Sequence, residues 1–326
     1  MSFRAHAAWI GLLIAGSVIA FLDVVGAERG LFFRDTIAVF KPLWSAAIEA
    51  LRAGELPAMT HWSPSGVPIE QSWAGALFTP ATAVLFLARF DVAYDLFVLF
   101  HVIALAIGAY ALAVRLGALP HEAAIGAGIA ALSGPILSLE NLVVALQGIV
   151  WLPWATLGAV AFLQTRRPIW LALLAGALAC HLQALLPEIV LFDALLAAAL
   201  LIHLRDRLSI KALLGLAAAT VAAAAVAAID LVPVLAVLSG TRRGSGFGLA
   251  EAQVWAFHPA QIVDLIAPSF WFSLREPSVA FPSLTGGPMP YLTSLYLGAA
   301  LGKTGDDRTL LGQSRRIAVG MLDHHG

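Results

Sequence analysis

Residues 212–238 read ALLGLAAATVAAAAVAAIDLVPVLAVL, an apolar stretch with one ionisable residue, Asp230, and one proline. A helix needs about 20 mostly apolar residues to cross the hydrocarbon core of a bilayer. The stretch therefore predicts a membrane-spanning helix. Its alanine-rich part, residues 217–228, indicates close packing against another helix through small side chains.

The rest of the chain has the same character. Hydrophobic residues make up 60% of the 326 residues and charged residues only 12%, against about 45–50% and about 25% in ordinary globular chains. A soluble monomer with this composition would leave large apolar areas facing water, which is rare. The composition predicts an all-α, polytopic integral membrane protein. The net charge of −1 gives no indication of nucleic-acid binding.

Further apolar runs predict a bundle of about eight spans. The candidates are residues 8–25, 93–114, 122–138, 142–164, 169–186, 188–203 and 212–238, with a last run from Tyr291 to about Leu301. Short turns at 139–141 and 186–188 separate neighbouring spans. A shorter run, 75–88, contains Pro80 and favours a re-entrant or interfacial segment over a full crossing.

The basic residues of the short loops predict the orientation. Positive charges gather on the cytoplasmic side of membrane proteins. With 75–88 not counted as a crossing, seven loop cations fall on one side; they are Arg4, Arg115, Arg166, Arg167, Arg205, Arg207 and Lys211. We therefore expect a multi-pass protein of the inner (plasma) membrane with a cytoplasmic N-terminus, and outer segments at about 26–74 and 239–290.

The first outer segment contains an amphipathic pattern. Between Asp35 and Arg52, apolar side chains recur at helical spacing and charges occupy the other face. Such a pattern is typical of a helix lying on a membrane surface. Asp35 stands at or next to its N-terminus, where a carboxylate caps free amide groups. The second outer segment is rich in aromatic residues and is either a lid beside a substrate or an interfacial plug without chemistry.

Several short motifs follow one another along the chain. They are Phe33-Arg34-Asp35-Thr36, His61-Trp62-Ser63-Pro64, Leu77-Phe78-Thr79-Pro80, Trp151-Leu152-Pro153-Trp154, Ile229-Asp230-Leu231-Val232-Pro233 and Val254-Trp255-Ala256-Phe257-His258-Pro259. In order and spacing, the series resembles the YfhO-like bacterial membrane proteins, which belong with the GT-C class of membrane glycosyltransferases. The likeness runs from about residue 20 to residue 298.

The resemblance implies a helical bundle with a long first outer loop, and transfer of a sugar from a polyprenyl-phosphate carrier to an acceptor on the outer face. It also implies an acidic catalytic base in that loop, which Asp35 matches. The chain departs from its relatives at Asp230, where many carry a neutral amide, and after Leu297, where polar residues replace further spans. We therefore expect a transmembrane domain over 1–301 and a truncated or frameshifted polar tail over 302–326, which would leave the chain inactive.

The candidate site residues each have a second interpretation. Asp35 is a general base, which sugar transfer requires, or a helix cap. Arg242 and Arg243 pair with a lipid phosphate through bidentate hydrogen bonds or contact anionic headgroups. His61 and His258 bind phosphate or move protons, or are solvated loop residues.

The remaining candidates are carboxylates. Glu140 and Glu188 are expected to line one polar cavity with Asp35, where their oxygens are candidate ligands for a divalent cation, or to be separate solvated turn residues. Asp230 lies inside a span, where a charge is costly. It should therefore face the bundle interior, be paired or be protonated, and it is a candidate substrate-binding residue.

Three classes of function remain open at this point. The first is a glycosyltransferase whose partners are a lipid-linked sugar donor and membrane lipids, with no cofactor other than the candidate cation. The second is a transporter or lipid flippase, which Asp230 favours, although no internal repeat of the transporter kind is evident. The third is an envelope assembly protein without turnover.

Overall fold

The computed structural model describes residues 3–25, 30–31, 35–57, 59–60, 67–68, 77–241, 244–246 and 248. These residues are helical or connect helices, apart from a two-residue antiparallel pairing of β1 (Met59–Thr60) with β2 (Val67–Pro68). The predicted run 291–301, the tail 302–326 and most of the second outer segment lie outside the described residues. The predicted all-α class is confirmed for the part of the chain that the structure describes.

The helices follow one another in the order that the apolar runs predict. They are α1 (Phe3–Ala20), the π-helix η1 (Thr36–Phe40), α2 (Lys41–Arg52), the 3-10 helix η2 (Pro80–Phe86), α3 (Phe90–Arg115), α4 (Pro120–Ala131), α5 (Gly134–Ser138), the 3-10 turn η3 (Leu139–Leu142), α6 (Val143–Val150), α7 (Leu152–Thr165), α8 (Ile169–Gln183), α9 (Pro187–His203), the 3-10 turn η4 (Arg205–Arg207) and α10 (Ile210–Leu238).

Three helical stretches of the described residues are long and apolar enough to cross a membrane. They are α3, the combined stretch Gly134–Thr165, and α10; the apolar helices Arg4–Ala20, Ile169–Gln183 and Ile189–His203 are shorter. The structure therefore supports a membrane protein by the length and composition of these helices. The full number of about eight spans stays a prediction.

One predicted boundary between spans is wrong. The helix that starts at Pro120 ends at Ala131, and the chain restarts at Gly134 rather than at residue 142. Pro135 explains the shift, because proline suits the first turn of a helix and disfavours helical geometry in the residue before it. The expected turn at 139–141 is the 3-10 turn η3 inside the combined stretch Gly134–Thr165.

Small residues allow the bundle helices to pack closely. Helix α3 packs against α1, α4 and α7, while α8 packs against both α7 and α10. A Cβ atom at Gly158 of α7 would lie 2.8 Å from the backbone nitrogen of Leu174 on α8, so the two backbones are in direct contact there. On α10, every fourth residue from Ala219 to Ala227 is buried, as expected for the alanine-rich run.

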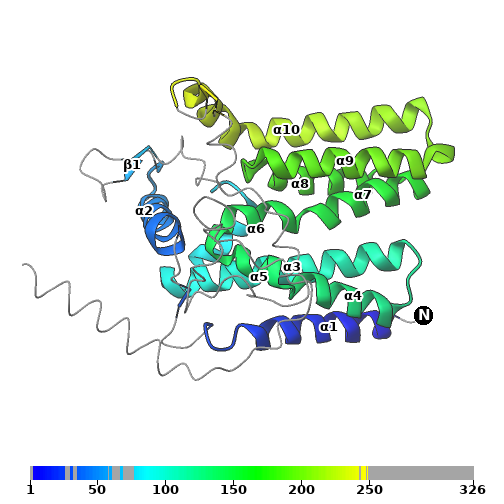
Figure 1. Cartoon of the computed structure of the whole chain (residues 1–326), viewed down its shortest axis with the longest axis horizontal. Helices are drawn as coiled ribbons and strands as arrows, with labels where there is room; N and C mark the ends of the chain where they lie inside the picture. The colour runs from blue at the N-terminus through cyan, green and yellow to red at the C-terminus, as the bar shows by residue number, and fades with distance from the viewer. Residues whose placement is uncertain are drawn as a thin grey trace, which may run out of the picture.

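The bundle has two chemically different ends. The basic end contains the start of α1 and the connections α3–α4, α7–α8 and α9–α10, and the opposite, polar end contains α2 and the end of α10 (Figure 1). The basic end is held together by side chains: Arg115 lies over the ring of Trp170, and Arg166 donates a hydrogen bond to the carbonyl of Arg207. The seven loop cations named in the orientation prediction therefore gather at one end, whereas Arg89, which precedes α3, lies at the other.

Helix η2 lies in the chain between α2 and α3. It has seven residues, and at about 2.0 Å per residue a 3-10 helix of this length spans about 14 Å, against about 30 Å of hydrocarbon. The described part of the run 75–88 is therefore too short for a full crossing. Arg52, at the end of α2, donates hydrogen bonds to the carbonyls of Leu85 and Ala88, so α2 and η2 lie at the same end of the bundle.

This arrangement gives a topology prediction. Cysteines introduced at Ser65 and Ser245 should both react with a membrane-impermeant reagent in intact cells, because α2, which precedes Ser65, and the end of α10, which precedes Ser245, lie at the same end of the bundle. Cys180, which is buried, is first replaced by serine. A cysteine at Asp206, whose side chain is 94% exposed at the basic end, is the matched control and should react only after permeabilisation. Labelling of only one of the two outer sites would contradict the topology.

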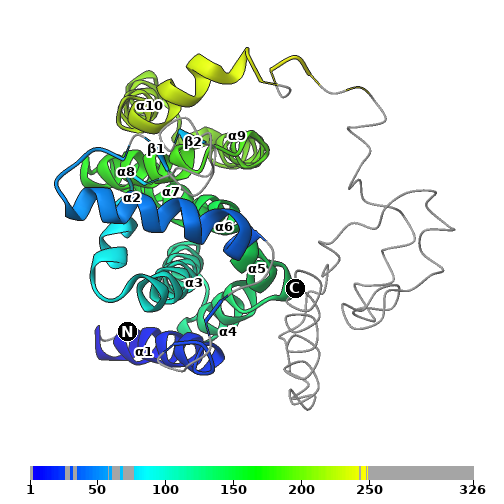
Figure 2. The same cartoon turned by 90° about the vertical axis from the view of Figure 1, so that its left-hand side faces the viewer.

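The amphipathic helix of the first outer segment lies across the polar end of the bundle (Figure 2). Its apolar face is buried in the protein at Leu43, Trp44, Ala47 and Ile48. The ring of Trp44 makes edge contacts with Tyr94 and Phe97 of α3, with centroids 6.1 and 5.2 Å apart. The expectation that this apolar face rests on lipid is thus wrong. An amphipathic helix can bury its apolar face against lipid or against protein, and here it packs against α3.

Candidate polar site at one end of the bundle

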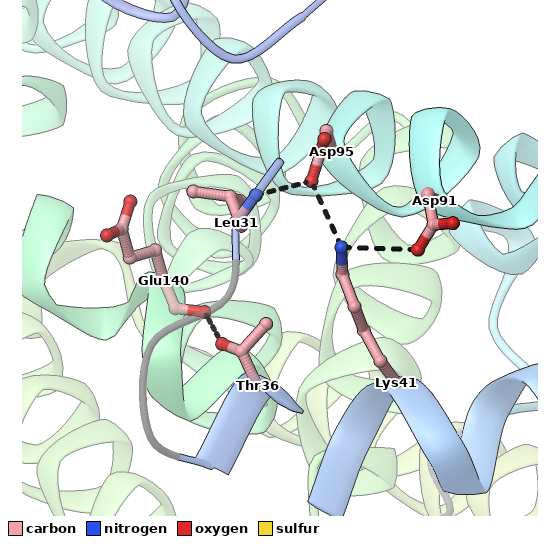
Figure 3. A network of polar contacts seen from close by, with 6 residues as sticks. All are labelled: Leu31, Thr36, Lys41, Asp91, Asp95 and Glu140. Carbon is pink, nitrogen blue, oxygen red and sulfur yellow. Dashed lines mark hydrogen bonds and ion pairs between the residues drawn. The ribbon is translucent and has the colours of Figure 1, made fainter. Parts of the chain in front are cut away.

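An ion-pair cluster joins α2 to α3 at the polar end. Lys41, the first residue of α2, places its Nζ atom 3.5 Å from Asp91 Oδ1 and 3.8 Å from Asp95 Oδ1 (Figure 3). The two carboxylates stand four residues apart on α3 and therefore share a face. The Lys41 ammonium group also lies 5.2 Å from the ring centroid of Tyr94, within the range of a cation–π contact.

The three members of this cluster differ in exposure. The side chains of Lys41 and Asp95 are 15% and 4% exposed, whereas that of Asp91 is 72% exposed. Asp95 Oδ1 also accepts a hydrogen bond from the backbone N–H of Leu31, at 3.2 Å. The backbone approaches closely at Gly30, where a Cβ atom would lie 3.3 Å from Asp95 Oδ2. Asp95 therefore holds both the chain before η1 and the start of α2.

Glu140 is attached to the same region through the first outer segment. Thr36 is 1% exposed, and its Oγ1 atom donates a hydrogen bond of 3.2 Å to the carbonyl oxygen of Glu140 (Figure 3). This hydrogen bond joins η1 to η3, and the polar cavity expected between Asp35, Glu140 and Glu188 stays a hypothesis.

Asp35 immediately precedes the anchored Thr36. It occupies the N-cap position of η1 with helical backbone angles (φ −65°, ψ −25°), and its side chain makes no capping hydrogen bond there. Its side chain is partly exposed. The backbone of Asp35 therefore lies next to Glu140. Capping of η1 does not explain why an acidic residue stands at this position.

Asp230 faces the bundle interior and is paired. Its side chain is 4% exposed, and its Oδ2 atom accepts a hydrogen bond of 2.7 Å from Nε2 of Gln183 on α8. The same amide nitrogen donates at 3.0 Å to the carbonyl of Phe78, just before η2. Asp230 therefore helps to hold the returning chain between α8 and α10. Among the described contacts, none connects it to the Lys41 cluster.

The other predicted site residues are not located. Glu188 belongs to α9, but its side chain lies outside the described part of the structure; His61, Arg242, Arg243 and His258 also lie outside it. Within the described ranges, no group of three or more His, Cys, Asp and Glu residues is arranged to hold a metal ion. The candidate divalent-cation site therefore stays a hypothesis.

Sequence reasoning missed several polar residues inside the predicted spans. Asp95 and His101 lie inside the predicted span 93–114, and Asp193 lies inside 188–203. His101 is fully buried, with Nδ1 2.7 Å from the carbonyl oxygen of Phe97, and Asp193 Oδ2 lies 3.0 Å from Nε2 of His181. The rule that singled out Asp230, an ionisable residue within a span, applies equally to these residues and was the available signal.

No family model, curated protein or solved structure matches this chain. The functional argument therefore depends on the residues and the geometry described above.

The Gln183–Asp230 contact gives a stability prediction. Asp230→Ala should lower the free energy of unfolding by about 1–3 kcal/mol, because a buried donor loses its acceptor. Asp230→Asn should cost less, since the amide keeps an acceptor oxygen. Thermal unfolding in detergent measures both, with Val232→Ala, at a position 59% exposed, as the control on the same helix. An Asp230→Ala protein as stable as the control would contradict this role.

Proposed function

We propose that this chain is a membrane glycosyltransferase-like protein of the GT-C type, which transfers a sugar from a polyprenyl-phosphate donor to a cell-envelope acceptor on the outer face. In this proposal the protein is multi-pass in the plasma membrane and its N-terminus is cytoplasmic. The supporting observation is the position of Asp35: an acid at the start of a segment docked on the polar end, beside Glu140, without a capping hydrogen bond.

The proposed reaction needs one protein group that takes up a proton. A hydroxyl of the acceptor substrate attacks the anomeric carbon of the sugar. The bond from that carbon to the phosphate oxygen breaks, and its electron pair leaves with the polyprenyl phosphate. A carboxylate within hydrogen-bonding reach takes the hydroxyl proton. Asp35 is assigned this role because its side chain is partly exposed at the polar end.

The other charged groups of the site have different roles. Lys41 is engaged by Asp91 and Asp95, so it serves to position the first outer segment. Arg242 and Arg243 follow the end of α10 in the chain and are the candidates for binding the donor phosphate, because a guanidinium group matches phosphate geometry in a bidentate manner.

The direct test is donor consumption. Membranes that contain the protein are incubated with a panel of polyprenyl-phosphate-linked hexoses and pentoses that carry a labelled sugar. The proposal predicts label in the envelope fraction and release of polyprenyl phosphate for at least one donor, above membranes that lack the protein. Absence of consumption across the panel would refute the proposal.

A transporter or lipid flippase is the second candidate, and its support is the buried, paired Asp230 in α10. Liposomes containing the purified protein and a fluorescent lipid separate the two functions. Movement of the lipid between leaflets without donor consumption would favour the flippase. Neither activity would favour an assembly protein without turnover.

A further inference from the structure

A cavity of about 360 Å³ lies between α7, α8, α9 and α10. Its volume falls within the range of about 300–1,000 Å³ that is typical of small-molecule sites. The lining is almost wholly alanine, valine and leucine, with Thr156, Thr220 and Asp193 as the exceptions. The Asp193 carboxylate is engaged by the buried His181 at 3.0 Å. The cavity therefore suits an apolar occupant.

Helix α9 forms the outer wall of this cavity. Ala197 and Leu200 of α9 and Leu204, directly after it, line the cavity, while Leu191 and Leu195 of the same helix are about 60% exposed on the outside. In a bilayer, the outer face of α9 contacts lipid chains, so these chains are the apolar molecules present beside the cavity.

The cavity extends towards the basic end of the bundle. Leu163 and Leu204 line it; Leu204 directly precedes Arg205, and Leu163 lies one turn before Arg166. The cations of the two adjoining connections are all exposed; they are Arg166, Arg167, Arg205, Arg207 and Lys211. Residues 163–213 contain three acidic residues, Glu188, Asp193 and Asp206, and of these only Asp206 lies in the two connections. Positive charge thus surrounds one end of an apolar cavity.

A contact between the two connections holds these cations together. Arg166 ends α7 in the left-handed region (φ 59°), where glycine is the usual residue. Its guanidinium group donates to the carbonyl of Arg207 and lies 5.8 Å from the ring centroid of Phe162. Arg166, at a position that favours glycine, therefore joins the α7–α8 connection to the α9–α10 connection beside the cavity.

We propose that the cavity and these basic connections form a binding site for one anionic phospholipid from the leaflet at the basic end. One acyl chain occupies the cavity, and the phosphate lies against the cations that follow α7 and α9. Basic pockets between membrane helices bind anionic headgroups in this way. The site is at the opposite end from Asp35, so its lipid is a structural or regulatory ligand and not the sugar donor.

The test uses the full chain purified in mild detergent and native mass spectrometry. Dioleoyl phosphatidylglycerol and dioleoyl phosphatidylcholine are added separately, because they share chains and differ in headgroup charge. Wild-type protein should retain one phosphatidylglycerol molecule in preference to phosphatidylcholine. Ala197→Phe, which places a ring in the cavity, should remove this retention. Ala199→Phe, on the outer face of α9 and outside the cavity, is the matched control and should retain the lipid.

A charge variant makes the test independent of packing in the bundle. Arg205→Gln combined with Arg207→Gln changes only exposed side chains and should weaken phosphatidylglycerol binding roughly fivefold for each cation removed, with little change for phosphatidylcholine. Equal retention of both lipids by the wild type, or full retention by Ala197→Phe, would overturn the proposal. Loss of binding in Ala199→Phe as well as in Ala197→Phe would also overturn it, since the cavity would then not be the determinant.

Discussion

Replacing Asp35 with asparagine is expected to lower sugar transfer by about 10²–10⁴-fold, the usual loss when a general base is removed, while the protein remains folded and inserted. Asparagine keeps the shape of the side chain and one acceptor oxygen, but it cannot take a proton. The assay is transfer of labelled sugar from the donor that the wild-type protein uses, in membranes that contain equal amounts of each variant.

The competing role of Asp35 as a helix cap predicts a different pattern. Asparagine is itself a good cap, and loss of a cap to alanine costs only about 1 kcal/mol, so a capping residue would give near-normal activity in Asp35→Asn and mild destabilisation in Asp35→Ala. The absence of a capping hydrogen bond at this position argues against that pattern. Full activity in Asp35→Asn would remove Asp35 from the mechanism, and Glu140→Gln would then be the next variant to assay.

The apolar helices were predictable because hydropathy is a local property of the sequence. The predicted runs 93–114, 169–186 and 212–238 differ by only a few residues from α3, α8 and α10. The boundary between 122–138 and 142–164 was misplaced because Glu140 was treated as a break. A single acid is tolerated inside a helical stretch when it lies in the bundle, whereas Pro135 forces a restart through its backbone geometry.

The contacts of the site were less predictable than its helices. An ionisable residue inside a span indicates that a partner exists, but it does not identify the partner. Gln183 pairs with Asp230 across two helices, and Lys41 reaches Asp95 from a segment outside the predicted spans. The amphipathic pattern of residues 35–52 likewise predicted a helix, but it did not identify what the apolar face packs against, which is α3 and not lipid.

The Lys41 cluster gives the prediction with the largest expected effect on stability. Asp95→Ala should lower the free energy of unfolding by about 3–5 kcal/mol, the range for breaking a buried ion pair, since Lys41 then keeps only its exposed partner, Asp91. Leu31 also loses the acceptor of its backbone N–H. Asp91→Ala is the matched control on the same face of α3: its carboxylate is 72% exposed, and exposed ion pairs contribute about 0–1 kcal/mol.

Two further variants separate the charge from the hydrogen bond. Asp95→Asn keeps an acceptor for the Leu31 N–H but removes the negative charge, so its stability should lie between that of Asp95→Ala and wild type. Lys41→Met combined with Asp95→Leu replaces the pair with apolar side chains of similar size, which is often neutral or stabilising for buried pairs. The double variant should therefore be more stable than the sum of its single changes predicts.

Urea unfolding in detergent, with limited proteolysis of the segment between α1 and α3, measures these effects. Equal losses in Asp91→Ala and Asp95→Ala, or strict additivity in the double variant, would show that the buried pair does not hold the first outer segment to α3.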